Sequence, residues 1–309
     1  MPRTLLLAEP RGFCAGVVRA IDALDRLLNQ LDEPVYVFHE IVHNRYVVDG
    51  FRSRGAVFID DISEAPDGSV VVFSAHGVDP AIIKDAERRE LKVIDATCPL
   101  VTKVHLEARK AAKDGYKILL VGHDGHDEVQ GTKGEAPEMT SVVDSAQDVL
   151  AISEPQSPVF VVTQTTLSVE DTLGTIEAIK IRFPDAEIRN DICYATTNRQ
   201  QAVKEMAERA DLVIVVGSAN SSNSVRLVEV AKSMGVNAHL VDGLSDIDPS
   251  WYTNAETVGL TAGASVPDEL LDPIIEDLKN RGVINIEPVV VAEETVEFRL
   301  PLELSGNGE

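Results

Sequence analysis

Two patterns of hydrophobic and polar residues alternate along most of the chain. Short runs of aliphatic and β-branched residues, such as VYVF at 35–38 and KILLV at 117–121, are typical of buried parallel strands. Between them, apolar residues recur every three or four positions, as from Val17 to Leu28, which predicts amphipathic helices. This alternation of strands and helices predicts an α/β protein with parallel sheets.

The alternation repeats three times. Each repeat has a strand that ends in a loop with one cysteine, then a helix, and then three further strands. The cysteines are Cys14, Cys98 and Cys193. The third strands read AVFID, SVVD and AHLVD, and the fourth strands lead into SAHG, TQTT and TAGAS. Chance similarity of α/β units is the alternative, but the polar residues recur in step with the strands. We therefore expect three similar domains with small parallel sheets around a pseudo-threefold axis.

The repeats set the expected domain boundaries. Domain 1 covers residues 1–97 and includes the N-terminal strand and Cys14. Domain 2 covers residues 98–190, and domain 3 covers residues 191–281. Residues 282–309 form a tail that we expect to be extended and to pack back on the domains.

Polar residues at the ends of the predicted strands are the candidates for function, because parallel sheets bind ligands beyond the carboxyl ends of their strands. Three of the seven histidines fall at such loop ends. The loops after the second strands supply His43, His126, Glu128, Ser221, Ser222 and Asn223, and those after the fourth strands supply His76, Thr165 and Ser265.

Two of these groups indicate particular chemistry. The segment from Ser221 to Asn223 precedes a helical pattern, and so does Ser265; helix N-termini favour anions such as phosphate. Simple N-capping is the alternative for both loops. Glu128 is the single carboxylate at the aligned positions, and a positioned carboxyl can donate a proton. A solvated glutamate in a loop is the alternative for Glu128.

The three cysteines can form one shared site. Their odd number and the lack of a CxxC motif argue against a disulfide framework and a zinc ribbon. Three thiolates with one added ligand can bind zinc. They can also hold a [4Fe–4S] cluster in which one iron has no protein ligand. The spacing does not decide between these metals, and separately buried cysteines are the structural alternative.

Charge and hydropathy narrow the possible partners. The chain has 28 basic and 51 acidic residues, a net charge of −23, which argues against binding to nucleic acid or anionic membranes. The N-terminal segment MPRTLLLAEPRG is neither a signal peptide nor a membrane span. We therefore expect a cytoplasmic protein with a small-molecule substrate.

Several segments resemble those of the 4-hydroxy-3-methylbut-2-enyl diphosphate reductases, the last enzymes of the non-mevalonate isoprenoid pathway. The similarity extends from about Leu5 to about Asp277 and includes each candidate residue. The segments that carry it are PRGFCAGVVRAI, EIVHNRYVV, FSAHGV, DATCPLVTKVH, GHDGHDEVQGT, TQTTLS, DICYATTNRQ, VVGSANSSNSVRL and TAGASVPD.

The resemblance implies a fold, a cofactor and a reaction. Three α/β domains would surround a central [4Fe–4S] cluster held by Cys14, Cys98 and Cys193. The reaction would be reductive dehydroxylation of the hydroxymethylbutenyl diphosphate to isopentenyl and dimethylallyl diphosphates, with electrons from a ferredoxin or flavodoxin. The catalytic residues would be Glu128, Thr165 and His126. The residues that bind the substrate would be His43, His76, His126, Thr165, Ser221, Ser222, Asn223 and Ser265.

Two other functions are compatible with the same residues. A hydro-lyase with a three-cysteine cluster would dehydrate its substrate without net electron transfer. A zinc scaffold or an iron–sulfur redox sensor would be non-catalytic. For an acidic electron donor, the basic run at Lys84, Arg88, Arg89 and Lys92 is the candidate docking patch.

Overall fold

The computed structural model describes residues 2–153 and 157–304. In this part of the chain the strands form three small sheets, and all strand pairs of these sheets are parallel. Helices alternate with the strands, so the expected α/β class is confirmed. No helix within these residues is long and apolar enough to cross a membrane.

The chain divides into two compact units, and each contains complete sheets. Unit 1 consists of Met1–Ala15, His43–Gly50 and Tyr194–Glu297, and unit 2 of Gly16–Val42, Phe51–Cys193 and Phe298–Glu309. Two of the three sheets belong to unit 2 and one belongs to unit 1. The chain passes from unit 1 to unit 2 after Ala15, which directly follows Cys14. It passes from unit 2 back to unit 1 directly after Cys193.

The two sheets of unit 2 have the same strand order. The first is β3-β2-β4-β5, with bounds Ala56–Ile59, Val35–Phe38, Val70–Phe73 and Lys92–Asp95. The second is β7-β6-β8-β9, with bounds Thr140–Val143, Lys117–Val121, Val159–Thr163 and Glu187–Ile188. β4 and β8 are buried along their whole length, as expected for central strands covered on both faces. The strand predicted before Cys193 is the short β9.

The helices of unit 2 begin at residues suited to helix N-termini. Asp79 and Pro80 start α3, Pro99 starts α4, and the hydroxyl of Ser168 caps α7. The apolar face of α4 then packs on β6 in a core that includes Val104. The helices are α1 (Ala15–Gln30), α3 (Pro80–Arg88), α4 (Pro99–Lys113), α5 (Asp127–Gly134), α6 (Ala146–Ala151) and α7 (Val169–Arg182).

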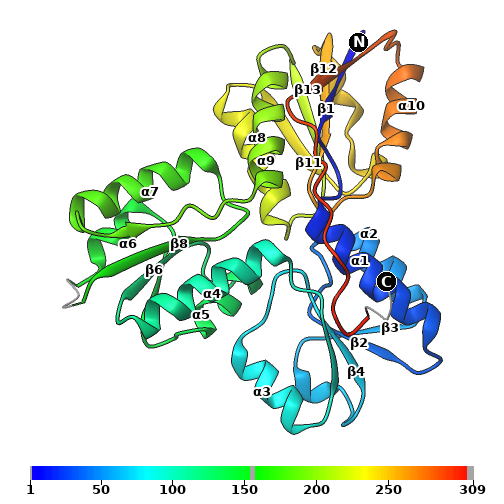
Figure 1. Cartoon of the computed structure of the whole chain (residues 1–309). Helices are drawn as coiled ribbons and strands as arrows, with labels where there is room; N and C mark the ends of the chain where they lie inside the picture. The colour runs from blue at the N-terminus through cyan, green and yellow to red at the C-terminus, as the bar shows by residue number, and fades with distance from the viewer. Residues whose placement is uncertain (1, 154–156, 305–309) are drawn as a thin grey trace. The chain divides into compact units, whose positions relative to one another are not determined.

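Unit 1 contains one sheet that joins both ends of the chain. Its order is β11-β10-β12-β1-β13, with bounds Asn237–Val241, Leu212–Val216, Thr257–Ala262, Thr4–Glu9 and Asn285–Val290. Figure 1 shows β1, in blue, beside β12 and the red β13. The accompanying helices are α2 (Arg45–Ser53), α8 (Tyr194–Ala207), α9 (Ser222–Ser233) and α10 (Asp272–Asn280).

The N-terminal strand therefore lies in a different sheet from the one we expected. We assigned β1 to the first domain, but it pairs with β12 and β13. The reason lies in the crossover connections: the turn of chain through α3 returns β5 to the edge of β4, and α7 returns β9 to the edge of β8. Each sheet is thus completed by the strand before the next cysteine. β1 takes this place beside β12, and the domain boundaries remain predictions.

Candidate active site

Each cysteine lies where a strand has ended and a helix begins. Cys14 precedes α1, Cys98 is the N-cap of α4, and Cys193 precedes α8. The backbone amide of each cysteine donates to a carbonyl in the loop after the neighbouring strand. These hydrogen bonds join Cys14 to Ala264 (3.1 Å), Cys98 to Ala75 (3.0 Å) and Cys193 to Thr165 (3.1 Å). The three repeats therefore place their thiols in the same local setting.

The setting of the thiols suits a soft metal group. All three thiols are half-buried, and the side chain of Cys98 makes no capping hydrogen bond to its helix. The start of a helix favours negative charge, which suits an anionic metal group. Thiolates are the ligands of iron–sulfur clusters. The donor set and its surroundings therefore fit such a cluster.

Glu128 and Thr165 form a buried pair in unit 2. Glu128 is in the first turn of α5, and Thr165 follows β8; they are 2% and 5% exposed. One carboxylate oxygen of Glu128 accepts from the Thr165 amide (2.6 Å) and the other from its hydroxyl (2.9 Å). Burial raises the pKa of Glu128 to about 7, against the opposing effects of the Thr165 hydrogen bonds and of His105. At neutral pH this carboxyl can both hold and release a proton.

Two of the predicted histidines lie beside this pair. His126 is the N-cap of α5, and its Nδ1 accepts from the Glu128 amide at 3.2 Å. A neutral His126 therefore carries its proton on Nε2 and can donate it to a ligand. The ring of His76 meets that of His126 edge to face, with centroids 5.9 Å apart. Unit 2 thus brings together Cys98, His76, His126, Glu128, Thr165 and Cys193 through consecutive contacts.

The remaining predicted residues gather in unit 1. Ala264 links two of them, because its carbonyl accepts from Cys14 and its amide donates to Asn223 Oδ1 at 2.9 Å. The next residue, Ser265, donates from its hydroxyl to the His43 carbonyl at 2.8 Å. Unit 1 therefore brings Cys14, His43, Asn223 and Ser265 together at the carboxyl end of β12, close to the start of α9.

The start of α9 combines a cap with donors for an anion. Ser221 Oγ accepts from the amide (3.4 Å) and the hydroxyl (3.0 Å) of Ser224, so the proton of Ser221 is available to a ligand. Ser222 is the first helical residue, and Asn223 is buried. The capping alternative is thus correct for Ser221, and it does not exclude anion binding, because the amides of the first turn still favour an anion.

The sequence did not reveal three polar residues that organise these loops. Gln164 accepts from the His123 amide (3.1 Å) and donates to the Thr166 hydroxyl (2.9 Å). Asp191 is buried two residues before Cys193, and Thr196 accepts from Asn223 at 3.5 Å. Repeat alignment could not find Asp191, because glycine and alanine occupy the equivalent positions before the other two cysteines. Gln164 had a signal, since it stands between Thr163 and Thr165 in TQTT.

Comparison with known proteins gives a consistent result across sequence and structure. The family model "LytB protein" matches residues 5–279. A 4-hydroxy-3-methylbut-2-enyl diphosphate reductase from Nocardia farcinica is 53% identical over 98% of this chain and 91% of its own length. The enzyme of the same name from Actinobacillus pleuropneumoniae is 51% identical over 97% of this chain and 98% of its own.

Solved structures agree with these relatives. The E-1-hydroxy-2-methyl-but-2-enyl-4-diphosphate reductase of Plasmodium falciparum matches with a TM-score of 0.95 and 39% identity, over 97% of this chain and 96% of that one. A second reductase, described as the terminal enzyme of the non-mevalonate pathway, matches with a TM-score of 0.65 and 31% identity, over 90% and 99% of the chains. The resemblance drawn from the motifs is confirmed: the chain belongs to the LytB family of reductases.

Proposed function

We propose that this chain reduces (E)-4-hydroxy-3-methylbut-2-enyl diphosphate to isopentenyl and dimethylallyl diphosphates. The names of its relatives support the reaction, and the buried Glu128–Thr165 pair is the structural observation that carries it. In this reaction the bond between carbon and the hydroxyl oxygen breaks. Two electrons and two protons are consumed, and a C–H bond and water are formed. The enzyme therefore needs a proton donor beside the departing hydroxyl.

We propose that Cys14, Cys98 and Cys193 together bind a [4Fe–4S] cluster. The equivalent settings of the three thiols support this assignment. When bound, the cluster supplies the electrons and an iron that lacks a protein ligand and acts as a Lewis acid.

Glu128 supplies the proton in this proposal. Its pKa of about 7 keeps a large fraction of the carboxyl protonated at neutral pH, while an ordinary glutamic acid would be almost fully ionised. The Thr165 hydroxyl contacts the carboxyl directly and can relay the proton by donating its own and accepting that of Glu128. Protonation makes the hydroxyl leave as water.

The start of α9 and three histidines bind the diphosphate in this proposal. Ser221, Ser222 and the first amides of α9 donate to phosphate oxygens. His126 donates from Nε2, and His43 and His76 complete the binding set. Asn223 keeps the Ala264 loop in place, and Ser265 turns its hydroxyl from the His43 carbonyl to a phosphate oxygen.

Anaerobic turnover tests the proposed reaction. The full chain is purified without oxygen, analysed for iron, sulfide and zinc, and given the hydroxymethylbutenyl diphosphate with reduced methyl viologen. We expect iron and sulfide, and both product diphosphates only when the reductant is present. Turnover without reductant would indicate a hydro-lyase, and a colourless zinc protein would exclude the cluster.

A pair of serine variants separates substrate binding from capping. Ser221→Ala and Ser168→Ala each remove an N-cap hydroxyl, at α9 and α7, which costs about 1 kcal/mol of stability. We expect KM for the diphosphate to rise only in Ser221→Ala. An equal KM in the two variants would show that Ser221 acts as a cap alone.

We propose a ferredoxin or flavodoxin as the physiological electron donor. The basic run suggested as its docking patch is mostly engaged in the fold. Arg89 donates to the carbonyls of Ile62 and Ala65, Arg88 pairs with Asp85, and Lys92 Nζ lies 3.8 Å from Glu33. Arg89→Glu should therefore weaken the fold, and donor binding is better tested with Arg88→Glu alone, as a salt-dependent loss of turnover with the protein donor but not with methyl viologen.

A further inference from the structure

Each helix that follows a cysteine carries a cation in its first two turns. Arg19, Lys103 and Arg199 stand five, five and six residues after Cys14, Cys98 and Cys193. Within residues 2–153 and 157–304, none of these cations makes a hydrogen bond or ion pair with the loop before its own cysteine. Each one instead binds the loop that precedes a different cysteine, as the following contacts show.

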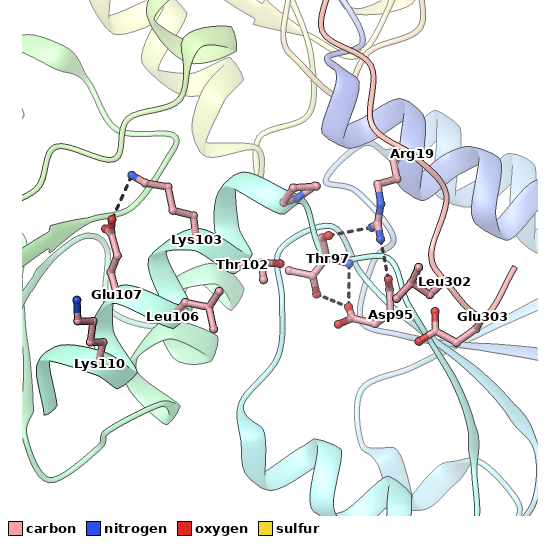
Figure 2. A pocket seen from close by; sticks show the side chains of 11 residues that line it. Arg19, Asp95, Thr97, Thr102, Lys103, Leu106, Glu107, Lys110, Leu302 and Glu303 are labelled. Carbon is pink, nitrogen blue, oxygen red and sulfur yellow. Dashed lines mark hydrogen bonds and ion pairs between the residues drawn. The ribbon is translucent and has the colours of Figure 1, made fainter. Parts of the chain in front are cut away.

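Arg19, on α1, binds the loop before Cys98. Its Nη1 donates to the carbonyl of Thr97 at 2.8 Å, and its Nη2 to that of Asp95 at 3.2 Å. Asp95 stiffens the same loop by accepting from the amide (2.9 Å) and the hydroxyl (2.5 Å) of Thr97. Figure 2 shows Arg19 pointing at these two residues on one wall of a groove of about 590 Å³.

Lys103, on α4, binds the loop before Cys193. Its Nζ lies 2.7 Å from Asp191 Oδ1, and the Asp191 side chain is 1% exposed. The backbone amide of Asp191 in turn donates to the Thr163 hydroxyl at 2.8 Å. A buried carboxylate needs a partner, so this contact ties α4 to the loop.

Arg199, on α8, binds the loop before Cys14. The side chain is completely buried, and Nη2 and Nε donate to the Gly12 carbonyl at 2.7 and 3.2 Å. Gly12 has φ of +65°, and a Cβ there would lie 2.8 Å from Asp268, so the loop has little freedom of its own. Glu294 balances the charge of Arg199 at 3.0 Å.

We propose that Arg19, Lys103 and Arg199 are positioning residues that hold the cysteine loops in place for one shared metal group. Their order is cyclic along the sequence: the helix after Cys14 holds the loop before Cys98, the helix after Cys98 holds the loop before Cys193, and the helix after Cys193 holds the loop before Cys14. A metal group held by three separate loops needs each thiol preorganised. The assignment rests on the proposed cluster, whereas the contacts themselves do not.

The C-terminal tail completes two of the three contacts. The carbonyl of Arg299 accepts from Arg19 Nε at 2.9 Å. Glu294 pairs with Arg199 and also accepts from Asn198 at 3.1 Å. Lys103 instead has Glu107 of its own helix at 3.6 Å. The tail thereby gains a function, which is to fix the side chains that position Cys98 and Cys14.

Cysteine labelling tests the proposal. Arg19→Met, Lys103→Met and Arg199→Met are made in the full chain, and the alkylation rate of each cysteine is measured by peptide mass spectrometry. Labelling is done while a chelator removes the metal without oxygen, and again after removal is complete. We expect a rate increase of about threefold to tenfold at one cysteine per variant, because a charge-assisted hydrogen bond is lost. The affected residues are Cys98, Cys193 and Cys14, respectively.

Exposed cations on the same helices are the controls. Arg26→Met on α1 and Lys110→Met on α4 should leave all three labelling rates unchanged. A rate increase at the cysteine of the mutated helix itself, or an equal increase at all three, would overturn the proposal, because helix loosening or global unfolding predicts those patterns. If Arg199→Met does not fold, Glu294→Gln must raise labelling of Cys14, and the other two variants still decide.

The proposed function and this proposal can fail separately. In the pattern that we expect, each variant raises the labelling of a cysteine that precedes another helix, and we call this crossed labelling. Crossed labelling in a chain that contains no iron would support the positioning contacts and exclude the cluster. Iron-dependent turnover without the crossed pattern would retain the function and exclude the positioning role. A further readout is the rate of iron loss to the chelator, which should rise in all three variants and in neither control.

Discussion

A buried glutamate is costly when ionised, and the environment of Glu128 reflects this cost. Burial raises its pKa, while two hydrogen bonds from Thr165 and the charge of His105 partly restore the ionised form. Asp191 acts in the same direction as burial. A pKa near 7 suits the proton-donor role that we propose for this carboxyl, because a group that titrates near the working pH both holds and releases protons readily.

The first prediction concerns the proton of Glu128. Glu128→Gln keeps the shape of the side chain and can still bond to Thr165, so the cluster should be retained. We expect turnover with reduced methyl viologen to fall by about 10²-fold or more, because a positioned acid contributes about that much. Iron content and turnover are measured on the same sample. Wild-type turnover in this variant would exclude Glu128 as the acid.

The pH dependence of Glu128 should appear in both rate and stability. Turnover should fall as pH rises past about 7, because the acid form is lost. The folded pKa is raised above the ordinary value of 4.5, so the folded state holds its proton longer than the unfolded state. The contribution of the Glu128 proton to stability is therefore fully present below about pH 4.5, and it is lost as pH rises towards 7.

Thermal melts of the wild type and of Glu128→Gln check the predicted effect of pH on stability. Glu128→Gln lacks the titrating group, so its melting temperature relative to wild type should be higher at pH 8 than at pH 5. A constant difference between the two proteins across this range would mean that Glu128 is not the group responsible.

At the residue scale, the sequence predicted side chains better than their backbone partners. Glu128 and the three cysteines stand at repeated positions, so alignment of the repeats singled them out as candidates. Arg19 and Arg199 also stand at repeated positions, but they bind carbonyl groups, which every residue has. The partner of such a cation therefore has no sequence signature, and only the fold reveals it.

In unit 2, a contact of the titratable side chain of His39 joins the end of β2 to the start of α5. His39 follows β2 of the first sheet, and its Nδ1 lies 2.8 Å from Asp127 Oδ1, in the first turn of α5 beside the second sheet. This hydrogen bond raises the pKa of His39, with burial opposing it. Because α5 also carries Glu128 and is capped by His126, a contact that holds α5 in place also supports the candidate catalytic pair.

The charge of His39 should make stability depend on pH. The raised pKa stabilises the fold fully below about pH 6.5, and this contribution is lost as pH rises through the folded value. We expect less than about 1 kcal/mol, because the pair is partly exposed. For a chain of 309 residues, that is less than about 2 °C in melting temperature.

Asp127→Asn tests the contact, with Asp124→Asn on the same loop as its control. The loss of melting temperature in Asp127→Asn should be greater at pH 6 than at pH 8.5, while Asp124→Asn should show no such change. The same loss at both pH values would argue against a charged His39.

At the element scale, strands and helices followed from hydrophobic periodicity. Apolar runs predicted the strands because parallel strands are buried on both faces, as β4 and β8 are. Periodicity could not say which sheet a strand joins. β1 and β5 both lead into a cysteine loop, yet β5 pairs with β4 and β1 pairs with β12, because strand pairing depends on the crossover that leads to each strand.

The excess of acidic residues affects the whole molecule. A net charge of −23 opposes compaction through self-repulsion. Salt shortens the screening length from about 10 Å at 0.1 M to about 3 Å at 1 M. We therefore expect the melting temperature to rise with sodium chloride. Chloride is preferred to sulfate, which strengthens apolar burial by itself. A melting temperature that falls with added chloride would show that attractive surface pairs outweigh the repulsion.

The threefold repeat was the most informative feature of the sequence, and it predicted most of the fold. Three sheets and three cysteine loops followed from it. The repeat could not assign β1, since an N-terminal strand has no preceding repeat to complete. The strand order shows the answer: β1 occupies beside β12 the place that β5 occupies beside β4.

Strand β1 is translated before both of its neighbours in the sheet, β12 and β13. β12 ends at Ala262 and β13 at Val290, so β1 can pair only after the two other sheets and most of unit 1 have been made. The loop that carries Cys14 is anchored to Ala264 and Gly12 to Arg199, and both anchors are translated late. In the proposed function, the loop of Cys14 would therefore be ready for a metal only after α8 and the loop of Ala264 have been made.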